Sequence, residues 1–293
     1  MKHYLYLRLN AILVLLMVSL NATSSDLIGK IDSLIKGKRM TVGVATECNG
    51  VQFTFNDSLH FPLLSVFKVH VAMAAVDKMQ NCGISADSII HISKKQLHPN
   101  TYSPLKQAHP NSDINITLAE LLKYSVALSD NNACDILIDF VGGINHVDSY
   151  IRNLGISGFR LCETELSMHS NIQRCRNNWS RPSCMLSVLK TLFESDNEGF
   201  GLICDIMHTT VTGPDKIPAG TPNGIKVAHK TGSSDRTEGI KIADNDAGVI
   251  FLPDAKCYVV VFIMDSSESD QTNAETIAEI THEIIPYYKN RHI

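Results

Sequence analysis

The sequence predicts an α+β fold, in the broad α/β class, with a five-stranded antiparallel sheet flanked by helices and joined to an all-helical lobe. Two strand-like runs rich in branched residues lie near the start of the chain and three more near its end. Between about residues 65 and 210, helical periodicity dominates. The five runs are MTVGVATE (40–47), VQFTFN (51–56), IKVAHKTGS (225–233), DAGVIFLP (246–253) and CYVVVFIMD (257–265). Because strands both precede and follow the helices, we expect one sheet assembled from both ends of the chain.

This order predicts a single unit made of two lobes. Residues 25–61 and 213–293 would form the sheet lobe, and residues 62–212 the helical lobe. Clefts between two such lobes are a favoured place for ligands. Thr117 followed by Glu120 has the pattern of a capping box and opens a helix over 117–130. The run NAETIAEITHEII (273–285) predicts a final helix that ends near Pro286.

The first 24 residues have the pattern of a signal peptide. The run MKHYLYLRLNAILVLLMVSLNATSS passes from a basic start through an apolar block to small residues, with cleavage expected near Ala22 to Ser25. The apolar block, about ten residues long, is short for a membrane span of roughly 20 residues. We therefore expect a periplasmic or secreted protein that is free of the membrane once the signal is removed.

Composition favours a globular protein that binds small molecules. Of the 293 residues, 44% are hydrophobic and 19% charged, which is enough to form a sizeable core. The formal net charge is −4 with scattered basic residues, which argues against a nucleic-acid or acidic-lipid partner. The histidines form neither His-x-His-x-Asp nor His-Glu-x-x-His, and the eight cysteines form no Cys-x-x-Cys pair. No metal and no cofactor are expected, and we expect a monomer.

Three short motifs carry the chemistry. Ser65 and Lys68 lie three positions apart in PLLSVFKVHVAMAA, on one face at the start of an apolar helix, which suits a nucleophile and its proton partner. Such a pair alone is expected about once by chance in a chain of this length. The segment SDNNA beginning at Ser129 and the segment HKTGS around Lys230 follow in order, and three such matches are rare by accident.

Together these motifs resemble the Ser-x-x-Lys, Ser-Asp-Asn and Lys-Thr-Gly signature of class A β-lactamases and penicillin-binding proteins. TYSPL (101–105) is similar to the family's gatekeeper tyrosine segment, and ETEL (163–166) to its Glu-x-Glu-Leu. The chain looks most like a divergent, cephalosporinase-rich branch of class A. The resemblance covers nearly the whole mature chain and implies a β-lactamase/transpeptidase-like fold.

The resemblance implies a role for each matched residue. Ser65 would attack the lactam carbonyl with Lys68 as its proton partner, and Ser129 would pass a proton to the leaving nitrogen. Lys230, with Thr231 and Ser233, would receive the substrate carboxylate. Backbone amides of Ser65 and Ser233 would form the oxyanion hole. The residues implied to contact the substrate are Tyr102, Asn131, Ser167, Thr231, Gly232 and Ser233.

Glu163 separates the two main interpretations, because class A enzymes use a glutamate to activate the water that releases the acyl group. It lies 34 residues after Ser129 and 67 before Lys230, close to the family's spacing. The sequence therefore predicts that Glu163 lies beside Ser65, with Ser167 as a second ligand of the water. A D-alanyl-D-alanine peptidase and a β-lactam sensor domain are the alternatives, and in both of them Glu163 would be a bystander.

The loop after Glu163 departs from the family pattern. Thr164 stands where proline is common, so a trans peptide bond is expected there. Leu161 and Asn178 occupy the positions of an ion pair that commonly closes the loop, so no such pair can form. A disulfide between Cys162 and Cys175 is one way to close it.

The arginine that commonly binds the substrate carboxylate also lacks a match. Glu238 occupies its place, which leaves Arg236 or Lys216 as substitutes.

Overall fold

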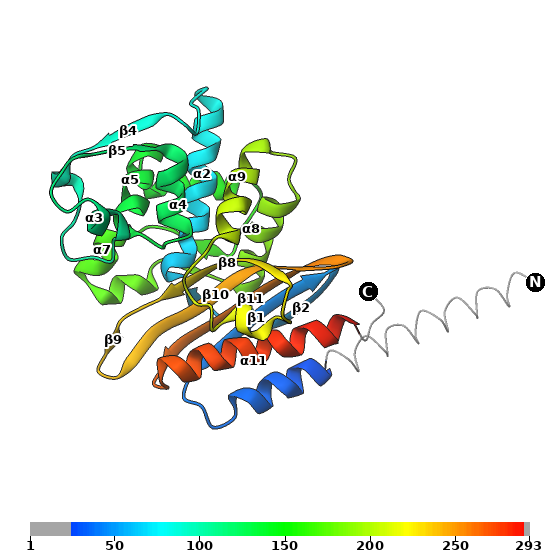
Figure 1. Cartoon of the computed structure of the whole chain (residues 1–293). Helices are drawn as coiled ribbons and strands as arrows, with labels where there is room; N and C mark the ends of the chain where they lie inside the picture. The colour runs from blue at the N-terminus through cyan, green and yellow to red at the C-terminus, as the bar shows by residue number, and fades with distance from the viewer. Residues whose placement is uncertain (1–24, 290–293) are drawn as a thin grey trace, which may run out of the picture.

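The computed structural model describes residues 25–289 and consists of a twisted sheet with helices on both faces (Figure 1). The predicted signal peptide at 1–24 lies outside the described residues. Within the described part of the chain, no helix is long and apolar enough to cross a membrane.

The central sheet has the strand order β2-β1-β11-β10-β8, so its path contains the five strands predicted. All neighbours pair antiparallel, and the two-residue β9 extends the sheet by pairing with β10. The strands are β1 (Thr41–Cys48), β2 (Val51–Phe55), β8 (Lys226–Ser233), β9 (Arg236–Thr237), β10 (Ile240–Leu252) and β11 (Ala255–Ser266). Because β1 pairs with β11, both ends of the chain form one sheet, as expected.

Strand β10 begins six residues earlier than the predicted run 246–253. Its first half contains Asp244 and Asn245, which are polar but buried. Buried polar residues require hydrogen-bonding partners from elsewhere in the fold, and these partners do not appear in a local pattern. Strand β10 is therefore longer than the apolar run from which it was predicted.

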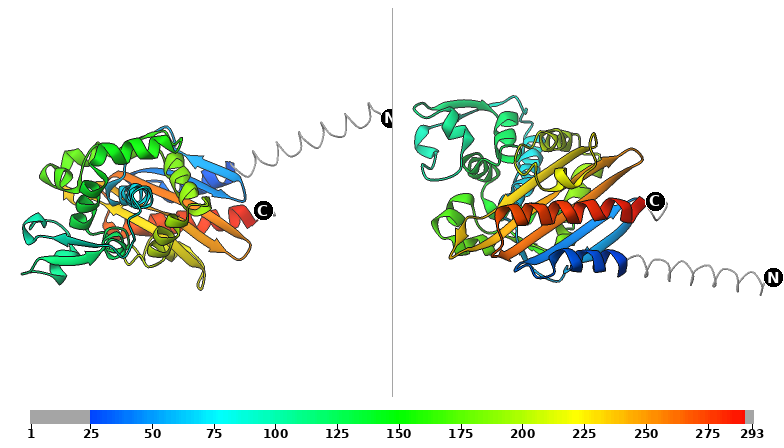
Figure 2. Two further views of the ribbon diagram at one scale, coloured as in Figure 1. Left: turned by 90° about the horizontal axis from the view of Figure 1, so that it is seen from above. Right: turned by 60° about the horizontal axis from the view of Figure 1, so that its bottom comes forward.

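One face of the sheet is covered by a helix over residues 25–35 and by α11 (Asp270–Lys289), which lie side by side across it (Figure 2, right). Leu27 and Ile31 of the first helix are fully buried together with Ile280 of α11. The prediction that the last helix ends near Pro286 is wrong, because α11 continues through this residue. Burial of the following Tyr287 and Tyr288 against the sheet holds the last turn in place of the hydrogen bond that proline cannot donate.

The other face carries the helical lobe, built around α2 (Lys68–Asn81). Figure 2 (left) shows α2 end-on among other helices of the lobe, and its residues from Lys68 to Val76 are all buried. The other helices are α3 (Pro104–Ala108), α4 (Leu118–Val126), α5 (Asn131–Val141), α6 (Ile144–Asn153), α7 (Glu165–Ser170), α8 (Pro182–Glu194), α9 (Glu198–His208) and α10 (Ile217–Gly220). Short 3-10 helices are η1 (Leu64–Phe67), η2 (Lys94–Gln96) and η3 (Ile172–Arg176). Minor strands are β3 (Phe61–Pro62), β4 (Ile89–Ile92), β5 (Ile114–Thr117), β6 (Phe159–Arg160) and β7 (Trp179–Ser180).

The predicted capping box is confirmed at the start of α4. The Thr117 hydroxyl accepts the Glu120 backbone N–H at 3.1 Å, and the Glu120 carboxylate accepts the Thr117 N–H at 3.1 Å. The helix ends at Val126, short of the predicted residue 130. The chain after it turns at Ser129, which has a positive φ of 58°.

Candidate active site

Ser65 lies in η1, the 3-10 turn that leads directly into α2. The preceding Leu64 is buried and has a positive φ of 46°, a strained conformation for a residue with a side chain. The Asn245 side chain on β10 donates to the carbonyls of Pro62 at 2.7 Å and Leu63 at 3.2 Å. These bonds anchor the strained turn to the middle of the sheet and so fix the position of the serine.

Gly232 lets strand β8 approach this turn closely. A Cβ atom at residue 232 would lie 2.4 Å from the Leu63 carbonyl oxygen and 3.1 Å from the Ser65 nitrogen. The first distance is far inside van der Waals contact, so only glycine fits. The result is that the backbone of β8 and that of Ser65 lie against each other.

Lys68 is fully buried and its ammonium has three partners. It donates to the Ser129 carbonyl at 2.7 Å and to the Asn131 side-chain oxygen at 2.6 Å, and it forms an ion pair with Glu165 at 3.0 Å. Three acceptors satisfy the three donors of an ammonium group. The lysine thereby joins α2 to the start of α5 and to α7.

Lys230 on β8 is the second fully buried lysine of the site. Its ammonium donates to the Ser129 hydroxyl at 2.8 Å and to the Thr231 carbonyl at 2.9 Å. Burial, reinforced by the positive charge of Lys68, lowers the pKa of Lys230 well below its usual value. Ser129 thus lies between two lysines, with its carbonyl on one and its hydroxyl on the other.

The carboxylate beside Ser65 belongs to Glu165, the first residue of α7. The Ser65 hydroxyl donates to Glu165 Oε1 at 3.4 Å, and Lys68 contacts the same oxygen. Asp135 on α5 positions this residue, because its two carboxylate oxygens accept the backbone N–H groups of Glu165 and Leu166 at 2.8 Å each. Burial, with the neighbouring charge of Glu165, raises the pKa of Asp135 to about 7.

Glu163 faces away from the serine and into its own loop. Its carboxylate accepts hydrogen bonds from Ser167 at 2.5 Å and Asn177 at 2.8 Å and contacts Arg174 at 3.5 Å. Burial opposes the charge on Glu163, but these partners outweigh it and hold its pKa below the usual value. The position predicted for Glu163 is therefore wrong.

Polar groups on β8, on β10 and in the segment just before α10 close the opposite end of the site. The Thr231 hydroxyl lies 2.6 Å from the Thr212 hydroxyl, and the Ser233 hydroxyl donates to Asp244 at 2.5 Å. Lys216, just before α10, donates to Ser233 at 3.1 Å and pairs with Asp244 at 2.5 Å. Burial opposes the charge on Asp244, but the ammonium of Lys216 lowers its pKa overall.

These groups line a cleft of about 360 Å³. The residues that line it are Ser65, Tyr102, Ser129, Asn131, Thr212, Gly213, Asp215, Lys216, Thr231 and Ser233. Tyr102 is half exposed at its mouth, and the Tyr102 carbonyl accepts the Asn131 N–H at 3.0 Å. Residues 25–289 contain no cluster of three or more His, Cys, Asp or Glu side chains that could hold a metal ion.

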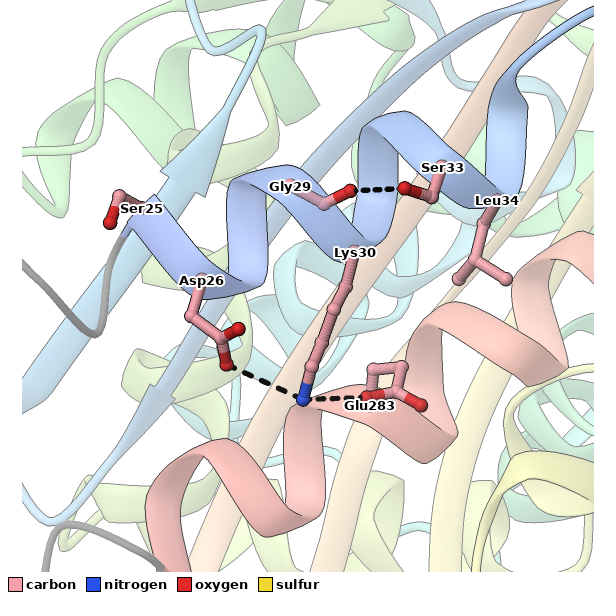
Figure 3. A pocket seen from close by; sticks show the side chains of 7 residues that line it. All are labelled: Ser25, Asp26, Gly29, Lys30, Ser33, Leu34 and Glu283. Carbon is pink, nitrogen blue, oxygen red and sulfur yellow. Dashed lines mark hydrogen bonds and ion pairs between the residues drawn. The ribbon is translucent and has the colours of Figure 1, made fainter.

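A second hollow, of about 430 Å³, lies on the other side of the sheet between the helix at 25–35 and α11 (Figure 3). Lys30 points across it and pairs with Asp26 at 3.4 Å and Glu283 at 3.0 Å. Its lining contains no arrangement of a nucleophile and a base comparable to that around Ser65. The cleft beside Ser65 is therefore the candidate active site.

Residues 26–288 match the beta-lactamase enzyme family. The chain belongs to this family. A beta-lactamase of Bacteroides uniformis is 49% identical over 264 residues, which cover 88% of this chain and 89% of that protein. The extended-spectrum beta-lactamase PER-1 of Pseudomonas aeruginosa is 34% identical over 278 residues, covering 91% and 90% of the two chains.

Solved structures agree with this family membership. A class A beta-lactamase from Bacteroides cellulosilyticus superposes with a TM-score of 0.88 at 44% identity, covering 92% of this chain and 99% of that one. The resemblance to class A β-lactamases that the motifs predicted is thus confirmed, and so is the fold class.

As a β-lactamase family member, the chain differs from the sequence prediction mainly in the loop around α7. Thr164 adopts an extended conformation and caps α7, because its hydroxyl accepts the Ser167 N–H at 3.2 Å. Ser167 completes this cap and binds Glu163, and does not lie beside Ser65. The described residues contain no cis peptide bond, so the trans bond expected at Thr164 is confirmed. The cap turns Glu163 outward and Glu165 inward.

The spacing to Ser129 and Lys230 favours the first glutamate of ETEL, but the sequence also contains two signals for the second. Thr164 followed by Ser167 has the pattern of a helix cap, which puts Glu165 in the first turn of a helix. Asp135 lies on α5, one helical turn beyond Asn131. From there its carboxylate can accept the backbone N–H of Glu165 in the first turn of the next helix.

An amide replaces the missing ion pair of this loop. The fully buried Asn178 accepts the backbone N–H groups of Cys162 at 2.8 Å and Glu163 at 2.9 Å and donates to the Glu163 carbonyl at 2.8 Å. All eight cysteines are free in this structure, Cys162 and Cys175 included. The loop is closed by three neutral hydrogen bonds.

Proposed function

We propose that this chain is a serine β-lactamase that hydrolyses the β-lactam amide of penicillins and cephalosporins through an acyl-enzyme on Ser65. The observation that carries the proposal is the meeting of the Ser65 hydroxyl and the Lys68 ammonium at one oxygen of Glu165. A hydroxyl with a carboxylate acceptor and a buried cation beside it is an activated nucleophile. Family membership supports the same reaction.

In the acylation step, the Ser65 oxygen attacks the lactam carbonyl and its proton passes to the Lys68–Glu165 pair. The oxyanion that forms accepts hydrogen bonds from the backbone N–H groups of Ser65 and Ser233. These two groups are close together because β8 approaches the serine turn at Gly232. A donor of this kind typically lowers the barrier by roughly 3 kcal/mol. Ser129 then gives a proton to the lactam nitrogen and is reprotonated with the help of Lys230, to which its hydroxyl is bonded.

The substrate carboxylate is bound at the β8 end of the cleft. Thr231 and Ser233 supply hydroxyls there, and Lys216 supplies positive charge. Of the two substitutes considered for the missing arginine, Lys216 fits better, because it lines the cleft while Arg236 is bonded to Asp270 at 2.6 Å. Asn131 and Tyr102 bound the opposite wall, where the substrate's side-chain amide would lie.

In the deacylation step, Glu165 takes a proton from water, which attacks the acyl carbonyl and releases Ser65. Glu165 is largely buried and is held by Asp135 and Lys68, so its carboxylate keeps one orientation. The role first assigned to Glu163 therefore passes to Glu165.

Turnover of a chromogenic cephalosporin tests this proposal. The purified mature protein should form product far beyond one equivalent, and Glu165→Gln should reduce this to a single burst. Glu163→Gln is the matched control and should keep sustained turnover. A single burst from the unmodified protein would indicate penicillin capture by a peptidase or sensor, and a burst from Glu163→Gln with turnover from Glu165→Gln would reverse the assignment.

Three finer statements belong to the same proposal. We infer export, supported by the signal-peptide pattern at residues 1–24. We infer a preference for cephalosporins, supported by the motif resemblance and by the similarity to PER-1, which is named an extended-spectrum enzyme. We also infer that the protein is a monomer. Its cleft would lie between two lobes, and the chain would pass from one lobe to the other near residues 62 and 213. N-terminal sequencing, relative kcat/KM values and sedimentation test these in turn.

A further inference from the structure

Cys48 and Cys257 face each other across the β1–β11 pair, far along the chain from one another. They are direct partners in the register of the two strands. Both are buried, at 1% and 0% exposure, in the core cluster beneath α11. None of the other six cysteines has a cysteine opposite it in the strand pairings of residues 25–289.

The register puts the two thiols within the reach of a disulfide. Directly opposite residues in antiparallel strands have Cα atoms about 4.5–5.5 Å apart and side chains on the same face. A disulfide spans Cα separations of about 4.4–6.8 Å. The bond therefore requires only side-chain rotation and no movement of either strand.

The two thiols shift each other's pKa in opposite directions. The neighbouring Cys257 thiol lowers the pKa of Cys48, while Cys48 and burial raise the pKa of Cys257. Thr46 lies 3.9 Å from the Cys257 sulfur. Cys48 is thus the partner that more readily becomes the thiolate, which is the attacking form in disulfide exchange.

We propose that Cys48 and Cys257 form a disulfide site that is oxidised by a small-molecule disulfide. The Cys48 thiolate attacks one sulfur of the oxidant, which releases one thiolate and leaves a mixed disulfide. Cys257, as its thiolate, attacks the Cys48 sulfur and displaces the second thiolate. Two electrons pass from the cysteines to the oxidant, and the two cysteine protons end on the two released thiols.

Burial determines when this reaction happens. The oxidant cannot reach either sulfur in the folded protein, because α11 packs Tyr287 and Tyr288 into the same cluster. The bond is therefore made while the chain folds, or when α11 opens. An oxidising compartment, as proposed for an exported chain, supplies the conditions for it.

The disulfide would stabilise the whole molecule. Residues 48 and 257 are about 200 residues apart, and the intervening chain includes the entire helical lobe. The chain-entropy stabilisation of a disulfide grows with the length of the loop that it closes. We expect the thermal midpoint of the oxidised protein to exceed that of the reduced protein by about 5–10 °C.

The test refolds the full mature chain from denaturant, once with a thiol reductant and once with a mixture of reduced and oxidised glutathione. Peptide mapping under non-reducing conditions should find Cys48 joined to Cys257 in the second sample only, with the higher thermal midpoint. Alkylatable thiols at both positions after oxidative refolding, pairing with other cysteines, or an equal or lower midpoint would each overturn the proposal.

Two comparisons make the result specific. Cys48→Ala should abolish the difference in midpoint between the two refolding conditions, whereas Cys82→Ala, which changes an exposed cysteine, should preserve it. Folded, reduced protein mixed with oxidised glutathione should react at Cys82 well before Cys48 and Cys257, and equal rates would contradict protection by burial. None of these readouts depends on the proposed hydrolysis.

Discussion

Asp135 on α5 accepts the backbone N–H of Glu165 on α7 at 2.8 Å, so one carboxylate fixes the position of the other. Its second oxygen accepts the Leu166 N–H at the same distance. Glu165, whose carboxylate faces Ser65, is thus oriented by a half-buried acid whose pKa is raised to about 7. This relationship makes the site sensitive to pH and to substitutions outside the three motifs.

Replacement of Asp135 should lower kcat, although this residue does not contact the substrate. Asp135→Ala leaves the part-buried Glu165 N–H without its acceptor, at a cost of about 1–3 kcal/mol, while water can replace the acceptor of the exposed Leu166 N–H. We expect kcat to fall about tenfold to a hundredfold because Glu165 loses its orientation. Steady-state kinetics with a chromogenic cephalosporin measures this, and Asp139→Ala on the same helix is a control that should change kcat little.

The same group predicts a pH dependence of activity. Above about pH 7, both Asp135 oxygens accept hydrogen bonds, while below it a proton occupies one of them. We expect kcat to fall on the acid side with an apparent pKa of about 7, the value of Asp135. Asp135→Asn should remove this limb from the profile, and an unchanged profile would contradict the assignment.

Stability should change with pH in the opposite direction. The pKa of Asp135 is raised on folding from 3.8 to about 7, so its contribution to stability is present below pH 3.8 and is lost as the pH rises through 7. Between about pH 5 and about pH 8, the free energy of unfolding should fall less in Asp135→Asn than in the unmodified protein. Denaturant unfolding at a series of pH values measures this difference.

Gly232→Ala should separate β8 from the serine turn. The added Cβ would meet the Leu63 carbonyl at 2.4 Å, and this backbone atom cannot move without displacing Ser65. We expect a loss of about 1–3 kcal/mol in unfolding free energy and a larger loss of activity. Gly201→Ala is the control, because nothing lies within 4 Å of a Cβ there and alanine favours its helix by up to about 1 kcal/mol.

Lys216→Ala should weaken substrate binding more than chemistry. The ammonium lies at the β8 end of the cleft with Ser233 and Asp244, so its loss should raise KM about tenfold and lower kcat less. Lys216→Arg should restore part of the effect because it keeps the charge. Arg236→Ala should leave KM nearly unchanged, and the opposite result would make Arg236 the carboxylate-binding residue.

Asn178→Ala should loosen the loop that carries Glu163 and Glu165. It removes three buried hydrogen bonds, which predicts a loss of about 1–3 kcal/mol in stability and faster proteolysis between 162 and 178. Limited proteolysis and thermal unfolding measure the two effects. Asn145→Ala, at an exposed position on α6, should show neither.

The sequence was most informative where local chemistry dictates local structure. The alternating strand runs, the Thr117 capping box and the three short motifs each depend on neighbouring residues, and the structure has them in the predicted places. The strained Leu64, anchored by Asn245 from a distant strand, and the Asn178 clamp depend on contacts between segments that no local pattern reveals.

The error at Glu163 has the same origin. Two glutamates stand two residues apart, and the spacing to Ser129 and Lys230 cannot distinguish them in a loop whose conformation is set by Thr164, Asp135 and Asn178. Helix α11 is similar, because burial of its last turn overrides the local effect of Pro286. In both cases tertiary contacts decided between two locally acceptable conformations.

The pairing of β1 with β11 also governs the order in which a growing polypeptide can become functional. Ser65 is synthesised early, but Asn245, which anchors the turn that carries Ser65, is synthesised some 180 residues later. A nascent chain that stops before this point contains Ser65 and Lys68 without the backbone geometry around them. The protein therefore acquires its chemistry only after Asn245 has been synthesised.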